Sequence, residues 1–227
     1  MLSQKTKPTT KKFYGKWLYK ASFQLAGCTV FRTNSFEAIN TFCLGPPPEI
    51  TYWHSSNAKA YDNRETILDI SKFLGNYNKD VYNLRIEQSF FDVYTNDLEF
   101  YQGISTKFES ILRHRFEPDE STAQLLSENK NYISVKKLPK NKYKYRVYLL
   151  PHKMAKDRDG KRAYINWIKA QGSKITCTTA IEKWFVATDW NWDRRYVLVE
   201  DESMLLMMKL RNSEVVGRVY NFVISDK

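Results

Sequence analysis

The sequence predicts an α+β protein with antiparallel sheets and helices on one face. Hydrophobic residues make up 42% of the 227-residue chain and aromatic residues 15%, which is enough apolar material for a packed core. Short alternating aromatic segments, typical of strands, are interleaved with segments of helical periodicity. Residues 194–227 give the clearest pattern, with a strand, an acidic turn, a helix and a strand in succession.

Within residues 194–227, the β-branched and aromatic run Tyr196–Val199 predicts a strand, and residues 219–224 predict another. Between them, Asp201 or Ser203 is expected to cap a helix whose acidic first turn suits the helix dipole. This order resembles half of a ferredoxin-like (RRM-like) fold. The resemblance covers only the order of elements, because no RNP-type run such as Lys/Arg-Gly-Phe-Gly-Phe occurs.

The first half of the chain shows the same alternation of strands and helices. Its three consecutive prolines, Pro46 to Pro48, break any regular element and predict a loop or insertion over 45–61. We expect a strand at 13–25, a helix at 33–43 capped by Asn34 or Ser35, a helix at 62–74, one long or two short strands at 81–94, a helix at 98–114 capped by Asp97, a helical turn at 122–128 and a strand at 132–138.

The second half repeats this order in outline. We expect a strand at 142–150, a helix at 157–171 with Ala163, Tyr164, Trp167 and Ile168 inward, a strand at 175–188, a turn at 190–193, and then the unit described above. The segments 93–97 and 197–201 have the same expected role, because each contains the end of a strand and the cap of the helix that follows.

The order of elements therefore predicts two tandem ferredoxin-like halves joined near residue 140. The expected organisation is a basic N-terminal arm at 1–12, a first half at 13–139 and a second half at 140–227. The alternative is that any α+β protein alternates elements in this way, since identity between the halves is slight.

The net charge of +11 is concentrated in two stretches. Residues 1–20 contain six lysines and no acid, and residues 136–162 contain eleven Lys or Arg against two Asp. These stretches hold +6 and +9, so the rest of the chain is net negative. Concentrated positive charge points to a polyanionic partner.

Basic residues interleaved with aromatic residues give the strongest functional signal. Strand alternation should place Lys142, Lys144 and Arg146 on one face, and the tyrosines between them on the other. The alternative is an ordinary half-buried strand with a solvated basic face. The candidate nucleic-acid-binding residues are Lys11, Lys12, Lys16, Lys136, Lys137, Lys140, Lys142, Lys144, Arg146, Lys153, Lys156, Arg158, Lys161, Arg162, Trp190, Trp192, Arg194 and Arg195.

Two tryptophans of this set, Trp190 and Trp192, flank one asparagine in an expected turn followed by two arginines. Such indoles could stack on bases or anchor a protein partner. The alternative is that one of them closes the hydrophobic core.

No arrangement of residues predicts a metal or cofactor site. The three cysteines are scattered without CxxC spacing and suit buried positions in a reducing compartment. The three histidines form no HxH or HExxH motif, and the acidic residues near the last helix suit turns and a helix N-terminus better than Mg²⁺. Phosphate-binding glycine motifs are also absent. His152, just after a basic strand, is the one weak catalytic candidate.

We therefore expect a non-catalytic protein that binds single-stranded or structured RNA or DNA. One alternative is a viral or phage structural or assembly protein that contacts copies of itself through Trp and Tyr surfaces. The other is a metal-independent endonuclease of the tandem ferredoxin-like type that uses His152. A polar, basic N-terminus and the lack of a long apolar run predict a soluble protein of the cytoplasm, or of the host cytoplasm or virion if viral, with no membrane partner.

Overall fold

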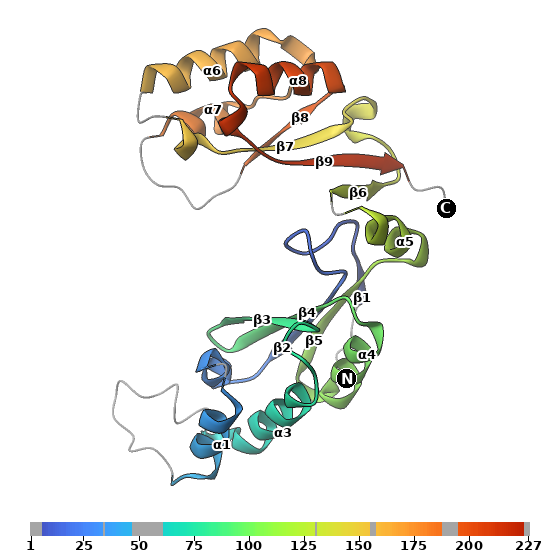
Figure 1. The fold of residues 1–227 in the computed structure, drawn as a ribbon, viewed down its shortest axis with the longest axis vertical. Helices are drawn as coiled ribbons and strands as arrows, with labels where there is room; N and C mark the ends of the chain where they lie inside the picture. Colours follow the sequence, from blue (N-terminus) through green and yellow to red (C-terminus); the bar gives the residue numbers. More distant parts are fainter. Residues whose placement is uncertain are drawn as a thin grey trace. The chain divides into compact units, whose positions relative to one another are not determined.

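The chain forms two compact α+β units, Met1–Ala123 and Gln124–Lys227, each with its own sheet (Figure 1). The computed structural model describes residues 6–33, 35–46, 61–129, 131–154, 158–187 and 195–224. The two halves expected on either side of residue 140 stay a prediction. Strand β6 (Tyr132–Val135), which was expected in the first half, pairs with a strand of the second unit.

The first unit contains a five-stranded sheet in the order β1-β5-β2-β4-β3. Strand β1 runs parallel to β5, and the other neighbours are antiparallel. Its elements are β1 (Thr6–Pro8), β2 (Tyr19–Gln24), η1 (Cys28–Thr33), α1 (Phe36–Leu44), α3 (Arg64–Gly75), β3 (Tyr82–Glu87), β4 (Phe90–Thr95), α4 (Leu98–Lys107), η3 (Glu109–Ile111) and β5 (Leu112–Glu117).

The second unit contains a four-stranded sheet in the order β6-β9-β7-β8, in which β6 is parallel to β9 and the other pairs are antiparallel. Helix α5 (Glu120–Glu128) precedes β6. The remaining elements are η4 (Pro139–Asn141), β7 (Tyr145–Leu149), η5 (Pro151–Lys153), α6 (Arg158–Ala170), η6 (Gly172–Lys174), α7 (Thr179–Val186), β8 (Tyr196–Val199), α8 (Glu202–Arg211), η7 (Ser213–Val215) and β9 (Val216–Ile224).

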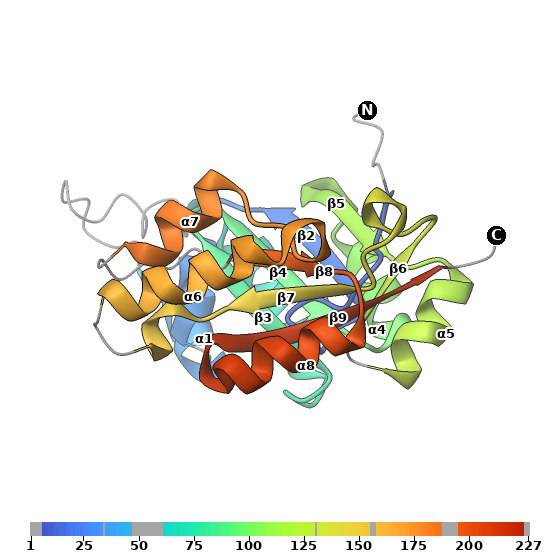
Figure 2. The ribbon, with the colours of Figure 1, turned by 90° about the horizontal axis from the view of Figure 1, so that it is seen from above.

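Each sheet packs its helices against one face. In the first unit, Phe23 of β2 stacks on Phe91 of β4 with ring centroids 4.8 Å apart, in a core shared with α1, α3 and α4. In the second unit, Val147 and Val197 meet Ile165 of α6 and residues of α7 and α8, which lie over β7, β8 and β9 in Figure 2. The face of each sheet opposite its helices is called its open face below.

The two units share one course through three consecutive elements, a helix, a short 3₁₀ helix and a strand. Residues 98–107, 109–111 and 112–117 correspond to 202–211, 213–215 and 216–221, with a constant difference of 104 in residue number. Helices α4 and α8 also bury corresponding positions. These are Phe100, Tyr101 and Ile104 in α4 and Met204, Leu205 and Met208 in α8.

The same helix cap opens both copies of this course. Asp97 accepts a hydrogen bond from the Phe100 amide at 2.9 Å, and Asp201 accepts one from the Met204 amide at 2.8 Å. The match between segments 93–97 and 197–201 therefore correctly predicted where each strand ends and each helix begins. Between residues 93–117 and 197–221 only this aspartate and one valine are identical, so geometry rather than sequence carries the correspondence.

Strand pairing is also equivalent in the two units. Tyr19 of β2 lies opposite Thr95, and Tyr145 of β7 lies opposite Val199, whose number differs from that of Thr95 by 104. One extra residue interrupts the pairing of β2 with β5 and of β7 with β9 near the same place. Strands β2 and β7 therefore hold the same position in their sheets.

Several predicted elements are confirmed. Residues 81–94 form two short strands, Ser35 caps α1 by accepting from the Ala38 amide, and α3 occupies the helix expected at 62–74. In the helix expected at 157–171, Tyr164 and Ile168 are buried. Ala163 of the same helix is exposed, so its predicted inward position is wrong.

Three other predictions were wrong. The sheets are mixed rather than antiparallel, because the short edge strands β1 and β6 run parallel to the last strand of each unit. The helix expected at 98–114 ends at Lys107, and 112–117 form strand β5. The strand expected at 175–188 contains α7, because Thr178 caps a helix by accepting from the Ile181 amide.

The two caps give a direct test of this correspondence. Replacing Asp97 or Asp201 with alanine should lower the free energy of unfolding of its own unit by about 1 kcal/mol, because an N–H at the helix start loses its acceptor. Urea denaturation measures this change. Ser203→Ala is the control, since Asp201 makes the cap of α8, and its effect should stay within about 0.5 kcal/mol. A larger loss for Ser203→Ala than for Asp201→Ala would contradict the assigned cap.

Candidate nucleic-acid interface

The basic candidates of residues 136–162 lie on different sides of the second unit. Arg146 is on strand β7, where it alternates with the buried core residue Val147 and so lies on the open face. Arg158 and Arg162 are on α6, which covers the opposite face, and both are exposed. The other exposed members lie in connecting segments or just before β7, and these are Lys136, Lys137, Lys140, Lys144 and Lys153. The stretch is therefore not one continuous surface.

Several candidates are engaged in contacts within the protein. Lys142 lies 3.2 Å from the Glu200 carboxylate and donates to the Ser173 carbonyl at 2.6 Å. Arg195 is half-buried and donates to the Ala180 carbonyl at 2.8 Å. Lys12 and Lys161 are buried, with 9% and 6% of their surface exposed.

The remaining candidates divide between exposed and undescribed positions. Lys11 is half-buried, and Lys16 is exposed with its Nζ 4.2 Å from the centroid of the Trp17 ring. His152 is exposed in η5. Four members of the set, Lys156, Trp190, Trp192 and Arg194, lie outside the described residues.

A first cation–aromatic cluster lies on the open face of the first sheet. The Nζ of Lys20 is 5.1 Å from the centroid of the Phe116 ring and 5.5 Å from that of Tyr94. The ring of Tyr94 is in turn covered by Phe13 and Tyr14, with centroids 5.6 and 5.2 Å away. This arrangement buries Tyr94, of which 2% is exposed.

The positive charge of Lys20 is paired with a carboxylate within the first-sheet cluster. Lys20 lies 2.8 Å from the carboxylate of Asp92, which also accepts hydrogen bonds from Ser22 at 2.5 Å and from the Tyr94 hydroxyl at 3.0 Å. Burial, then the Tyr14 hydroxyl and the Asp92 charge, hold the pKa of Tyr94 well above its usual range, so it stays a neutral donor. The lysine and the two donating hydroxyl groups of this cluster are therefore all paired with the Asp92 carboxylate.

A second cation–aromatic cluster lies on the open face of the second sheet, and we call it the Arg146 cluster. The guanidinium carbon of Arg146 is 4.3 Å from the centroid of the Tyr196 ring and 5.5 Å from that of Phe222. The ring of Tyr148 on β7 lies near rings on both neighbouring strands. Its centroid is 5.6 Å from that of Tyr196 on β8 and 6.0 Å from that of Tyr220 on β9. A second cation, Arg218, donates to the Tyr220 hydroxyl at 3.0 Å.

The charge environment of Arg146 differs from that of Lys20. Strands β6, β7, β8 and β9 contain no aspartate or glutamate. Among the described residues Arg146 makes no ion pair, and its Nε is buried without a hydrogen-bond partner. The Arg146 cluster therefore combines cations and aromatic rings with no carboxylate on its own strands.

Lys20 and Arg146 occupy equivalent positions. Lys20 lies opposite Phe116 and Arg146 lies opposite Tyr220, and the two partners differ by 104 in number. Alternation along its strand predicted the place of Arg146 from the sequence. Lys20 and the rings around Arg146 were not predicted, although Tyr148 shares the face of Arg146 by the same alternation.

No metal site emerges from the described part of the chain. There, no group of three or more His, Cys, Asp or Glu residues is placed to hold a metal ion. The thiols of Cys28, Cys43 and Cys177 are free, and burial raises the pKa of Cys28 to about 11. Within the same residues, every helix is too short or too polar to cross a membrane.

Comparison with known proteins does not assign the chain to a family. No family model matches the chain, and no match was found among curated proteins or solved structures.

His114 of β5 gives a pH-dependent test of the first-sheet cluster. Burial first, and then the charges of Lys7, Arg113 and Lys20, lower the pKa of His114 below its ordinary 6.5. An unfolded chain then binds this proton more readily than the folded chain. The stability that neutral His114 contributes should be complete above pH 6.5 and decrease as pH falls from there through the lower folded pKa.

An NMR titration of the His114 ring checks this pKa directly. The expected midpoint lies below 6.5, and Lys7→Gln should move it upward because one neighbouring positive charge is removed. Lys144→Gln, a matched change in the other unit, should leave it in place. A wild-type midpoint at or above 6.5 would show that the cationic environment is misassigned.

Proposed function

We propose that the protein binds single-stranded or structured RNA or DNA, without catalysis, through the Arg146 cluster on the open face of its second sheet. The observation that carries this proposal is Arg146 itself. It lies beside two aromatic rings, on strands without acidic residues, and makes no ion pair within the described residues.

The chemistry of Arg146 favours a phosphate group or a nucleobase edge as its partner. Arg146 is only half-buried, so part of its side chain is accessible to a ligand. A guanidinium group presents its donors in a planar fork that matches phosphate oxygens. The nearby Arg218 and exposed Lys144 add positive charge beside the same cluster.

The aromatic residues suit unstacked bases. Tyr196 is 38% exposed and already lies against a guanidinium group, so one of its faces can accept a base. Stacking of a base on an aromatic side chain contributes roughly 1–3 kcal/mol and tolerates any base. Because duplex bases are already stacked on one another, this surface favours single strands, loops or bulges.

We also propose that the two units are copies of one ferredoxin-like unit. The first unit contains strand, helices, two strands, helix and strand in sheet order β5-β2-β4-β3, and β9-β7-β8 repeats three of these strands. In the second sheet the place of β3 is taken by a single antiparallel bridge, Ile175 opposite Val199, rather than by a full strand. The shared numbering difference of 104 and the shared cap support descent from one unit.

The proposed duplication separates the roles of the two open faces. The first is closed by its own Asp92 and by the rings of Phe13 and Tyr14, and so acts in stability. The second has kept the equivalent cation and aromatic rings without the carboxylate. We therefore assign nucleic-acid binding to the second unit.

A matched pair of arginines tests the proposed surface. Arg146→Gln should weaken binding of a single-stranded oligonucleotide by roughly 10- to 100-fold, as expected for losing a charged hydrogen bond of about 1.5–3 kcal/mol. The slope of log affinity against log salt should also become shallower by about 0.7. Fluorescence anisotropy at several salt concentrations measures both quantities.

The control for this pair is Arg162→Gln, which removes the same charge from α6 on the helix-covered side. Arg162 lies 3.6 Å from Asp159 and is exposed, so its loss should change neither the fold nor the salt slope. Equal effects of the two substitutions would mean that net charge, rather than the Arg146 cluster, governs binding.

A second substitution separates stacking from charge. Tyr196→Leu keeps an apolar side chain but removes the aromatic face, and should cost about 1–3 kcal/mol of binding to single strands. Its effect should persist at high salt, where phosphate contacts are weakened. Thermal unfolding provides the control for stability. Unchanged affinity of a stably folded Tyr196→Leu protein would exclude base stacking at this position.

A further inference from the structure

Helix α8 carries apolar side chains on two opposite sides. Met204, Leu205 and Met208 are buried in the core of the second unit. Three further large residues on the same helix point to solvent, with exposed fractions of 55% for Leu206, 44% for Met207 and 78% for Leu210. A surface helix of a monomer ordinarily has a polar outer side, whereas α8 buries apolar side chains on one side and exposes apolar side chains on the other.

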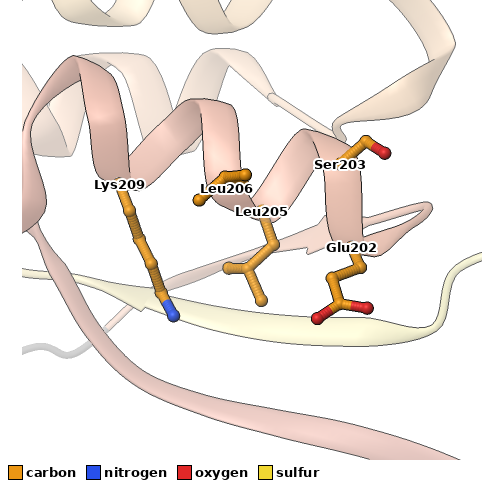
Figure 3. A pocket seen from close by; sticks show the side chains of 5 residues that line it. All are labelled: Glu202, Ser203, Leu205, Leu206 and Lys209. Atoms are coloured by element: carbon orange, nitrogen blue, oxygen red, sulfur yellow. The ribbon is translucent and has the colours of Figure 1, made fainter.

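A shallow groove of about 310 Å³ runs along this helix. It is lined by Glu202, Ser203, Leu205, Leu206 and Lys209, all residues of α8 (Figure 3). Glu202 and Lys209 lie at its two ends, with the leucines between them. The groove therefore has an apolar middle, a negative end and a positive end.

The equivalent helix of the first unit shows that the fold does not require these apolar residues. Leu206, Met207 and Leu210 correspond in number and in helix position to Gln102, Gly103 and Thr106 of α4. Helices α4 and α8 share the same cap and three buried positions, but α4 also buries Ser105, the counterpart of Lys209, and its Gly103 lies against Phe73 of α3. The apolar outer side is thus particular to α8 and points to a contact made there.

We propose that α8 of one chain pairs antiparallel with α8 of a second copy, about a two-fold axis near Leu206. A two-fold contact brings the same surface of both copies together, so the surface must complement itself. In this arrangement Glu202 of each copy lies beside Lys209 of the other, while the three exposed apolar residues of each helix cover one another. Antiparallel helices also oppose their dipoles favourably.

The choice of a second copy follows from this charge order. An acid at the start and a base seven positions later on the same side of one helix are reversed in an antiparallel copy, so each meets its opposite. The contact lies on the helix side of the sheet, whereas the Arg146 cluster lies on the open face. Self-association and nucleic-acid binding are therefore separate inferences with separate tests.

Sedimentation velocity of the full chain over a range of concentrations tests the pairing. The wild type should show a reversible monomer–dimer equilibrium. Leu210→Glu, at the most exposed of these positions, should raise the dimer dissociation constant about 30-fold or more, because a charge replaces an apolar side chain that the second copy would bury. The matched change Thr106→Glu on α4 should leave the equilibrium unchanged.

Charge exchange fixes the direction of the pairing. Glu202→Lys alone should weaken the dimer, and the double change Glu202→Lys with Lys209→Glu should restore it, because each helix again meets its opposite. Circular dichroism of each variant checks that the fold is kept. A wild type that stays monomeric at its solubility limit would overturn the proposal. So would a dimer that Leu210→Glu leaves unchanged, or a double exchange that fails to restore association in a folded protein.

Discussion

Strands β2 and β7 lie inside their sheets and are hydrogen-bonded to a neighbour on each side. Their position decides what each face of a unit can do. Because side chains alternate along a strand, burying Ala21 and Val147 under the helices places Lys20 and Arg146 on the open faces. A slip of one residue would bury these cations in the apolar core. The hydrophobic pattern therefore fixes both the register and the place of the candidate site.

The same fold places a cation on the open face of each unit, but the surroundings of the two cations differ. In the first unit the cation is neutralised by Asp92, and its surroundings are closed by aromatic rings. In the second unit the position equivalent to Asp92 is Tyr196, so a carboxylate is exchanged for a ring that stacks on the guanidinium of Arg146. This exchange leaves Arg146 without an ion pair among the described residues, whereas Lys20 is paired with Asp92.

Local signals in the sequence predicted the local structure well. The caps at Asp97 and Asp201, the strands within 81–94, which were expected as one long or two short strands, and the last strand–helix–strand unit all follow from short-range chemistry. Strand β1 was missed because it has three residues and its partner β5 is distant in sequence, and β6 was expected as a strand but not as a parallel neighbour of β9. The run at 175–188 was ambiguous, since threonines favour strands but also cap helices.

The candidate site was predicted only in part, for a related reason. Alternation along one strand is sufficient to place Arg146, but the rings around it come from β8 and β9, and their register depends on tertiary pairing. Charge counting also gave Lys161 and Lys142 the same weight as Arg146. Burial of the first and the Glu200 contact of the second distinguish them only once the helices and strands are assembled.

The central claim is that the open face of the second sheet is the nucleic-acid surface. Ultraviolet cross-linking of a single-stranded oligonucleotide to the full chain, followed by mass spectrometry of the peptides, tests it most directly. The account predicts cross-links to the aromatic residues Tyr148 and Tyr196, which lie beside Arg146 on adjacent strands. Cross-links confined to α6, on the covered side of the same sheet, would contradict it.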